Sequence, residues 1–212
     1  MAISDEITRL QNAKSALKTS IEAKGVTVSD STLISGYAAL VDQIQTGSGG
    51  GGGNEDLINL IERDITTFNI PSGITKIGAY SFFGCSALTS LTIPNSVVAI
   101  SGYAFSSCSA LTSVTIPNSV ESIGEYAFSY CRGLTSLTIP DTVKSLGYGV
   151  FYNCSSLTSV TIQATTPPSL GSSAFTNTNN CPIYVPAESV DAYKTATNWS
   201  SYADRLQPIP TE

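Results

Sequence analysis

The sequence repeats itself every 23 residues over more than half of its length. Three successive copies read SLTIPNSVVAISGYAFSSC, SVTIPNSVESIGEYAFSYC and SLTIPDTVKSLGYGVFYNC, beginning at Ser90, Ser113 and Ser136. The columns that recur at this interval are Ile70, Ile93, Ile116, Ile139 and Ile162; Pro71, Pro94, Pro117 and Pro140; Phe82, Phe105, Phe128 and Phe151; and Cys85, Cys108, Cys131 and Cys154. Because apolar residues hold the same places in every copy, each copy is expected to build the same local structure.

A period of this length, with LTSLTI or LTSVTI in each copy, predicts a leucine-rich-repeat solenoid. In such a fold each turn contacts only its two neighbours, so residues 23 apart lie on top of one another. We expect a right-handed coil of parallel β-strands joined by short 3₁₀ or helical turns. Within one copy, Leu111, Val114 and Ile116 are predicted to point inward from a strand. Pro117 ends that strand because it has no N–H, and Gly124 permits a tight corner.

The last copy departs from the pattern, because Leu170 and Phe175 come one residue late. The segment after it, AESVDAYKTATNWSSYADRLQPI, is aromatic and is predicted to be helical. It is expected to cover the open end of the solenoid, as terminal caps do. The covering side chains are predicted to be Val190, Tyr193, Trp199, Tyr202 and Leu206.

The chain before the repeats has a different composition. Two helices are expected within residues 1–46, and the first carries an apolar stripe in a short heptad-like spacing. This stripe either packs on the rest of the chain or meets copies of itself in an oligomer, and its members are Ile7, Leu10, Leu17 and Ile21. Residues 47–53, GSGGGGG, form a flexible linker, either a natural hinge or an expression linker. Residues 54–69 are expected to cap a solenoid over 70–186, and 187–212 to form the C-terminal cap.

Composition excludes several classes of function. The net charge is −6, whereas a nucleic-acid-binding protein needs a basic face. The sequence has no histidine, the commonest general base and imidazole ligand. We find no paired carboxylates, activated nucleophile or phosphate-binding loop, so we expect no enzyme, no cofactor and no metal. No stretch is apolar enough to span a membrane, and the first residues do not resemble a signal peptide, so we expect synthesis in a cytosol without membrane insertion.

The four cysteines of the repeat admit two interpretations. Equivalent Cα atoms in stacked turns lie about 4.8 Å apart, which permits a disulfide or a metal ladder. The simpler interpretation is a stack of small buried thiols, since free cysteine is among the most buried residue types. The 23-residue spacing is a repeat spacing and not that of a C-x-x-C metal site.

Two columns of hydroxyl side chains are predicted to face outward from the strands. They include Ser113, Thr115, Ser136 and Thr138. Such columns are a solvated face of good strand formers, a contact surface for a glycan or protein, or a surface that orders water as ice-binding solenoids do. The sequence leaves these alternatives open.

The differences between copies gather around the Ala-Phe pair. Tyr130 stands where other copies have Gly, Ser or Asn, and Arg132 where they have Ser. Tyr148 and Tyr152 also replace residues that are smaller or polar in most other copies. These four side chains are predicted to lie together on adjacent turns. Tyr and Arg often anchor protein interfaces, and a group of aromatic rings also suits sugars, so we predict a binding site here. The alternative is sequence drift on an exposed surface, which explains the same pattern.

The repeat resembles the BspA-like, Treponema-type leucine-rich repeat. That pattern, L-x-x-I-x-I-P-x-x-V-x-x-I-G-x-x-A-F-x-x-C, is met over about residues 65–186. In one copy it is carried by Leu111, Val114, Ile116, Pro117, Val120, Ile123, Gly124, Ala127, Phe128 and Cys131. Ser101 departs from the glycine of the pattern and Val150 from its alanine.

The two ends resemble narrower groups. Residues 7–44 are similar to N-terminal segments of tail and baseplate proteins in phages of gut bacteria, and the closing segment is similar to the terminal cap of BspA-like proteins. The resemblance implies a receptor-binding tail-fibre or baseplate protein of a virion. Residues 1–46 would then join other tail proteins and form a homo-oligomer, with a trimer favoured. The solenoid would contact a bacterial surface glycan or protein. The alternatives are a cellular BspA-like adhesin that binds host protein, or a purely structural virion protein.

Overall fold

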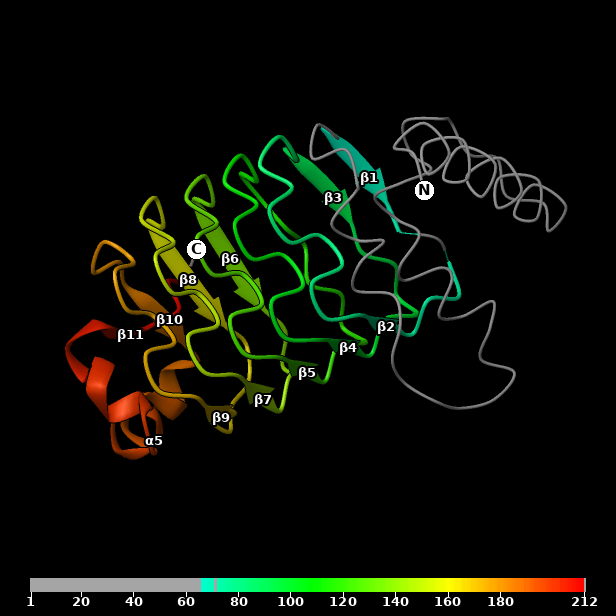
Figure 1. The fold of residues 1–212 in the computed structure, drawn as a ribbon. Helices are drawn as coiled ribbons and strands as arrows, with labels where there is room; N and C mark the ends of the chain where they lie inside the picture. The colour runs from blue at the N-terminus through cyan, green and yellow to red at the C-terminus, as the bar shows by residue number, and fades with distance from the viewer. Residues whose placement is uncertain (1–65, 71, 212) are drawn as a thin grey trace, which may run out of the picture.

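The repeats form stacked turns with short parallel strands along their sides (Figure 1). The computed structural model describes residues 66–70 and 72–211. We call each repeat a rung. The described strands are β1 (Thr67–Asn69) and β3 (Ser90–Thr92) in one sheet; β6 (Ser136–Ile139), β8 (Ser159–Ile162), β10 (Ile183–Val185) and β11 (Leu206–Pro208) in a second; and β2 (Lys76–Ile77), β4 (Ala99–Ile100), β5 (Ser122–Ile123), β7 (Ser145–Leu146) and β9 (Ser169–Leu170) in a third.

Strand pairing joins each position to its counterpart in the next rung. Lys76 pairs with Ala99 and Ser136 with Ser159, both 23 residues apart. Between β7 and β9 the offset is 24, since Ser145 pairs with Ser169. The extra residue predicted in the last repeat is therefore accommodated by a shift of the chain, and the rungs stay in register. The right-handed sense of the coil remains a prediction.

Phenylalanine rings run through the centre of the stack. The predicted contact of Phe105 with Phe128 is confirmed, with ring centroids 5.1 Å apart and planes 15° from parallel. Phe82 and Phe151 continue the column on either side, at 5.0 and 5.8 Å. These rings are almost completely buried. Each large ring thus covers the face of the next, and no rung encloses this core alone.

The Ala-Phe segments are hydrogen-bonded turns and not the 3₁₀ or α-helical turns that the sequence predicted. We call residues 79–84, 102–107, 125–130, 148–153 and 172–177 the turn segments. The second and sixth residues of each have positive φ, for example Tyr103 at 57° and Ser107 at 65°. A right-handed helix needs negative φ throughout, so these residues prevent one.

Alternate residues of each turn segment direct their backbone N–H groups toward the next rung. In one turn segment Tyr103, Phe105 and Ser107 donate to the carbonyls of Glu125, Ala127 and Ser129, at 2.7–2.8 Å. The same three bonds recur in the neighbouring rungs. The turn segments therefore exchange ladder hydrogen bonds as strands do.

One predicted strand is absent from the described structure. Residues 111–117 form no strand, although Val114 and Ile116 are buried and Ser113 and Thr115 exposed, as predicted. The predicted alternation of buried and exposed residues is therefore present although the segment forms no strand. The interruption separates the sheet of β1 and β3 from that of β6 and β8.

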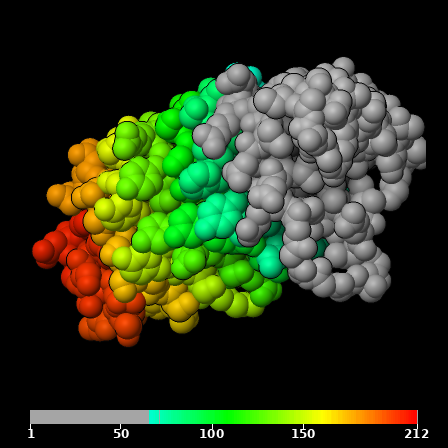
Figure 2. All heavy atoms as spheres, in the orientation of Figure 1, coloured from blue at the N-terminus to red at the C-terminus, as the bar shows by residue number. Residues whose placement is uncertain are grey.

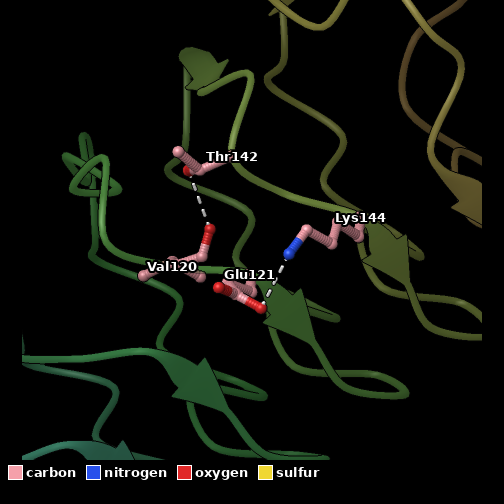
Figure 3. A network of polar contacts seen from close by, with 4 residues as sticks. All are labelled: Val120, Glu121, Thr142 and Lys144. Atoms are coloured by element: carbon pink, nitrogen blue, oxygen red, sulfur yellow. Dashed lines mark hydrogen bonds and ion pairs between the residues drawn. The ribbon is translucent and has the colours of Figure 1, made fainter.

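Successive rungs lie against one another as closely packed bands of colour (Figure 2). Side chains add further links between them. Thr142 Oγ1 donates to the carbonyl of Val120 at 2.9 Å, and Lys144 Nζ lies 3.0 Å from Glu121 Oε2 (Figure 3). Both charged side chains are exposed, so this ion pair contributes little stability.

The C-terminal segment closes the stack with η1 (Ala187–Ser189), α5 (Val190–Thr195), η2 (Trp199–Arg205) and then β11. Tyr193, Trp199 and Leu206 are buried as predicted, whereas Ser189 makes no capping hydrogen bond with its side chain. The pairing of β11 with β10 was not predicted. The cap is thus helical at first and ends as one more strand.

This cap supplies the hydrogen bonds of the missing next rung. The N–H of Phe175 donates to the Tyr202 hydroxyl at 3.1 Å, where other phenylalanines use a carbonyl. Asn198 Nδ2 donates to Leu170 O at 2.6 Å and Trp199 Nε1 to Pro168 O at 2.7 Å. Three backbone groups at the end of the stack are therefore satisfied by side chains of the cap. The predicted stripe of Ile7, Leu10, Leu17 and Ile21, the linker 47–53 and most of 54–69 lie outside the described residues.

Glycine marks the corner before four of the five described turn segments, and Ser101 stands at the fifth. A Cβ on Gly147 would lie 2.3 Å from Glu125 N and 2.4 Å from the carbonyl carbon of Gly124. Both are backbone atoms of the preceding rung, so the neighbour has no flexible side chain to move aside. The corner is therefore closed to any larger residue.

We predict that Gly147→Ala lowers the free energy of unfolding by about 1–3 kcal/mol through overpacking. Gly78→Ala is the matched control, because among the described residues its Cβ would meet the Ser81 hydroxyl alone, at 3.1 Å. Urea denaturation of both variants measures the difference. Equal effects of the two substitutions would contradict the close approach at Gly147.

Candidate binding surface

Tyrosine side chains form a column along the outside of the turn segments. Tyr80 stacks on Tyr103 with centroids 4.9 Å apart and planes 7° from parallel. Tyr103 stacks on Tyr126 at 5.0 Å and 26°. We call these three residues the tyrosine column. Within it, each ring covers the face of its neighbour.

The column ends in the next rung because Gly149 stands at the tyrosine position. The Tyr126 ring fills the space beside it, since a Cβ on Gly149 would lie 2.6 Å from Tyr126 Cε1. The tyrosine of this rung comes one residue earlier. The ring of Tyr148 meets Tyr126 edge-on, at 5.1 Å and 68°.

Further aromatic contacts extend from this break. Tyr152 lies 6.4 Å from Tyr126 and 5.7 Å from Tyr130, in both cases with steeply inclined planes. The Arg132 guanidinium lies over the Tyr130 ring, 5.6 Å from its centroid. We call Tyr126, Tyr130, Tyr148, Tyr152 and Arg132 the tyrosine cluster. It contains all four residues that the sequence predicted to lie together.

Several of these tyrosines have a backbone conformation that L-residues disfavour. The φ angles of Tyr126 and Tyr130 are 52° and 59°. The left-handed region costs about 1–2 kcal/mol per residue, and Gly or Asn usually occupies it. Gly84 and Asn153 do so at the position equivalent to Tyr130. Stacking offsets the cost within the column, by about 0.5–1.5 kcal/mol per ring pair, whereas Tyr130 lies outside the column. Strain of this kind is a reason to suspect a functional role.

The cluster is accessible and carries little charge. Tyr148 is 44% exposed and Tyr130 37% exposed. Arg132 is exposed beside them, and Glu125 is the exposed acidic residue of the same turn segment. Burial, and next the carboxylate of Glu125, raise the pKa of the Tyr103 hydroxyl. The surface therefore combines ring area, hydroxyl groups and one guanidinium.

Sequence comparison identifies the repeat. The pattern of the BspA type leucine rich repeat region matches residues 61–182 in six copies. The chain belongs to the BspA-type leucine-rich-repeat family. This family is defined by a repeat and not by a catalytic site, and no enzyme family is indicated. The comparison with curated proteins found no match.

Solved structures of similar proteins share this fold. The leucine-rich-repeat protein TpLRR of T. pallidum is 27% identical, with 57% of this chain aligned to 55% of that one and a TM-score of 0.50. A leucine-rich cell surface protein of Faecalibacterium prausnitzii A2-165 is 25% identical over 69% of this chain and 36% of that one, with a TM-score of 0.53. The pneumococcal vaccine antigen PcpA, at 22% identity, shows the fold alone. The chain thus spans about half or less of the length of these proteins.

The other sequence-predicted site residues lie on another side of the BspA-type rungs. Ser136 and Thr138 are exposed on β6, and Ser113 and Thr115 are exposed on the segment before it. Tyr80, Tyr103 and Tyr126 were not among the residues predicted from the sequence to lie on a binding surface. Tyrosine at the same place in three successive copies was the available signal.

The cysteine column is structural in the described rungs. Cys108, Cys131 and Cys154 are buried free thiols, and each donates to the carbonyl of a phenylalanine in the preceding rung at 3.0–3.2 Å. Burial raises the pKa of all three, that of Cys154 to about 12. These thiols are therefore poor nucleophiles near neutral pH. Across residues 66–70 and 72–211 we find no cluster of metal-ligating side chains, nor any helix with the length and apolar character of a membrane span.

The surroundings of Tyr126 change the acidity of its hydroxyl group. A hydrogen bond with Tyr148, and secondly burial, raise the pKa of Tyr126 to about 12. The ordinary value is about 10, so folding disfavours the tyrosinate form. The resulting contribution to stability is fully present below about pH 10 and is lost as the pH rises toward 12.

We predict that Tyr148→Phe lowers the pKa of Tyr126 toward its ordinary value. An alkaline titration of tyrosinate absorbance measures this, with Tyr126→Phe used to assign the transition. Tyr184→Phe, on β10, is the control and should leave that transition in place. An unchanged titration in Tyr148→Phe would show that the two hydroxyls are not coupled.

Proposed function

We propose that this chain is a non-catalytic adhesin whose tyrosine cluster contacts a partner on a cell surface. The observation that carries the proposal is the group of exposed and half-buried tyrosines beside Arg132, in which Tyr126 and Tyr130 have left-handed backbones. Tyr and Arg are the residues that most often dominate the binding energy of interfaces. The stack of rungs provides the rigid support that such a surface needs.

Two settings for this adhesin are compatible with the sequence. Similarity to a cell surface protein of Faecalibacterium prausnitzii supports display on a bacterial surface. The resemblance of residues 7–44 to phage tail proteins supports the tip or baseplate of a virion. There, residues 1–46 would form the trimer and join other tail proteins. A third setting, a purely structural virion part, predicts no cell binding at all.

Mass spectrometry separates the first two settings. We expect peptides of this chain in the protein shaved from intact cells if it is displayed by a bacterium, and in purified particles if it belongs to a virion. A cytosolic protein serves as the marker of cell lysis in both preparations. If peptides of this chain are recovered only in samples that also contain the cytosolic marker, both settings are contradicted.

The binding proposal is tested with Tyr130→Asn. Asn suits the left-handed backbone at this position, so stability is expected to be unchanged or higher, whereas binding to cells is expected to fall about tenfold. Cell binding is measured by flow cytometry of the labelled full chain on a panel of bacterial strains and epithelial cells. The urea midpoint is measured on the same samples.

Ser107→Asn is the matched control, because Ser107 holds the equivalent left-handed position in the preceding rung at a φ of 65°. It should alter stability in the same direction and leave binding unchanged. Loss of binding in both variants, or in neither, would exclude Tyr130 as a contact. No binding of the unaltered chain to any cell would overturn the adhesin proposal itself.

A further inference from the structure

We infer that the tyrosine cluster recognises a neutral glycan, through the faces of its hexopyranose rings. This inference rests on the proposed function and names the class of its ligand. Pyranose rings have apolar C–H faces and a rim of hydroxyl groups. They are bound by aromatic ring faces together with neutral or singly charged hydrogen-bonding groups.

The orientation of the rings is the first argument. In the tyrosine column the planes are 7° and 26° from parallel, so neighbouring rings cover the inner faces. In the cluster the corresponding angles are 62–80°. An edge-on ring leaves more of its neighbour's face open than a stacked ring does. The facing sides of the rings are therefore more open in the cluster, beyond the break at Gly149, than in the stacked pairs of the column.

The balance of charge is the second argument. Arg132 is the cation that lies over a ring of the cluster, and Lys144 is already paired with Glu121. Asn153 holds the position equivalent to Tyr130 in the next rung. Its side-chain oxygen accepts a hydrogen bond from Asn177 at 2.9 Å. Amides, phenols and one guanidinium suit the hydroxyl groups of a sugar. A polyanion would require several basic side chains.

Preorganisation is the third argument. The turn segments are held by backbone bonds from rung to rung, and the Tyr126 ring packs between Tyr103 and Tyr148, with centroids 5.0 and 5.1 Å away. Little side-chain freedom is left to lose on binding, which favours a flat and weakly interacting ligand such as a polysaccharide.

The inference is tested by affinity electrophoresis of the full chain in native gels that contain galactomannan, hydroxyethyl cellulose or laminarin. Heparin serves as the anionic comparison. We expect at least one neutral polysaccharide to retard the chain and heparin to leave its mobility unchanged. Tyr148→Ala and Tyr152→Ala are each expected to weaken the retardation about tenfold.

Tyr80→Ala is the matched control, since Tyr80 is 41% exposed and Tyr148 44%, but Tyr80 stacks in the column. It should leave retardation within about twofold of that of the unaltered chain. Circular dichroism and urea midpoints verify that each variant is folded. Equal loss in Tyr80→Ala, retardation by heparin alone, or no retardation by any neutral polysaccharide would overturn the inference.

A second measurement separates this inference from the proposed function. Cells that bind the chain are treated either with periodate, which cleaves vicinal diols of sugars, or with a protease. Loss of binding after periodate supports the glycan. If binding survives periodate and is lost after proteolysis, the adhesin function is supported, and the inference of a glycan ligand is overturned in favour of a protein partner. If a neutral polysaccharide retards the chain but the chain binds no cells, the inference of a glycan ligand is supported and the adhesin function is overturned.

Discussion

The stacking of each residue on its counterpart in the next rung is the constraint on which this structure depends. It acts at once on the phenylalanine rings, on the strand pairs and on the N–H groups of the turn segments. A larger side chain at the Gly147 corner would separate two rungs and weaken all three kinds of contact. This explains why the inward positions scarcely vary between copies, whereas the outward positions of the turn segments do.

The candidate binding surface is a local departure from that regularity. Three rungs carry tyrosine at the same position and stack their rings, and the next rung has Gly149 there and Tyr148 one residue earlier. The exchange leaves the phenylalanine and cysteine columns in place, since Phe151 and Cys154 are buried in this rung as their counterparts are in the others. A repeat protein can therefore vary a recognition surface while the fold beneath it stays the same.

Much of the fold could be predicted from the sequence, because a fixed period identifies which residues share a column. The buried phenylalanines and thiols, the late last repeat and the covering role of Trp199 all follow from that argument. The turn conformation did not follow, since a helix and a left-handed turn bury the same residues. The strand missing at 111–117 also left no mark on the pattern of polar and apolar residues.

The candidate site was predicted in part, because the fixed period shows where one copy differs from its equivalents. Tyr130, Arg132, Tyr148 and Tyr152 differ from their counterparts and so stood out, whereas Tyr126 matches its counterparts and did not. Its position at the centre of the cluster depends on ring orientation, which no spacing encodes. The role of Arg205, which donates to the carbonyls of Phe175 and Cys181 at the end of the stack, depends likewise on geometry.

The uniform direction of the turn-segment hydrogen bonds has an electrostatic consequence. Every N–H in these columns points toward the C-terminal end, from Tyr80, Phe82 and Gly84 in the first described rung to Gly149, Phe151 and Asn153 in the fourth. Their peptide dipoles add, as they do along an α-helix, but with the opposite polarity relative to the chain. This edge of the molecule is therefore polarised along its length, with its positive pole toward the C-terminal cap.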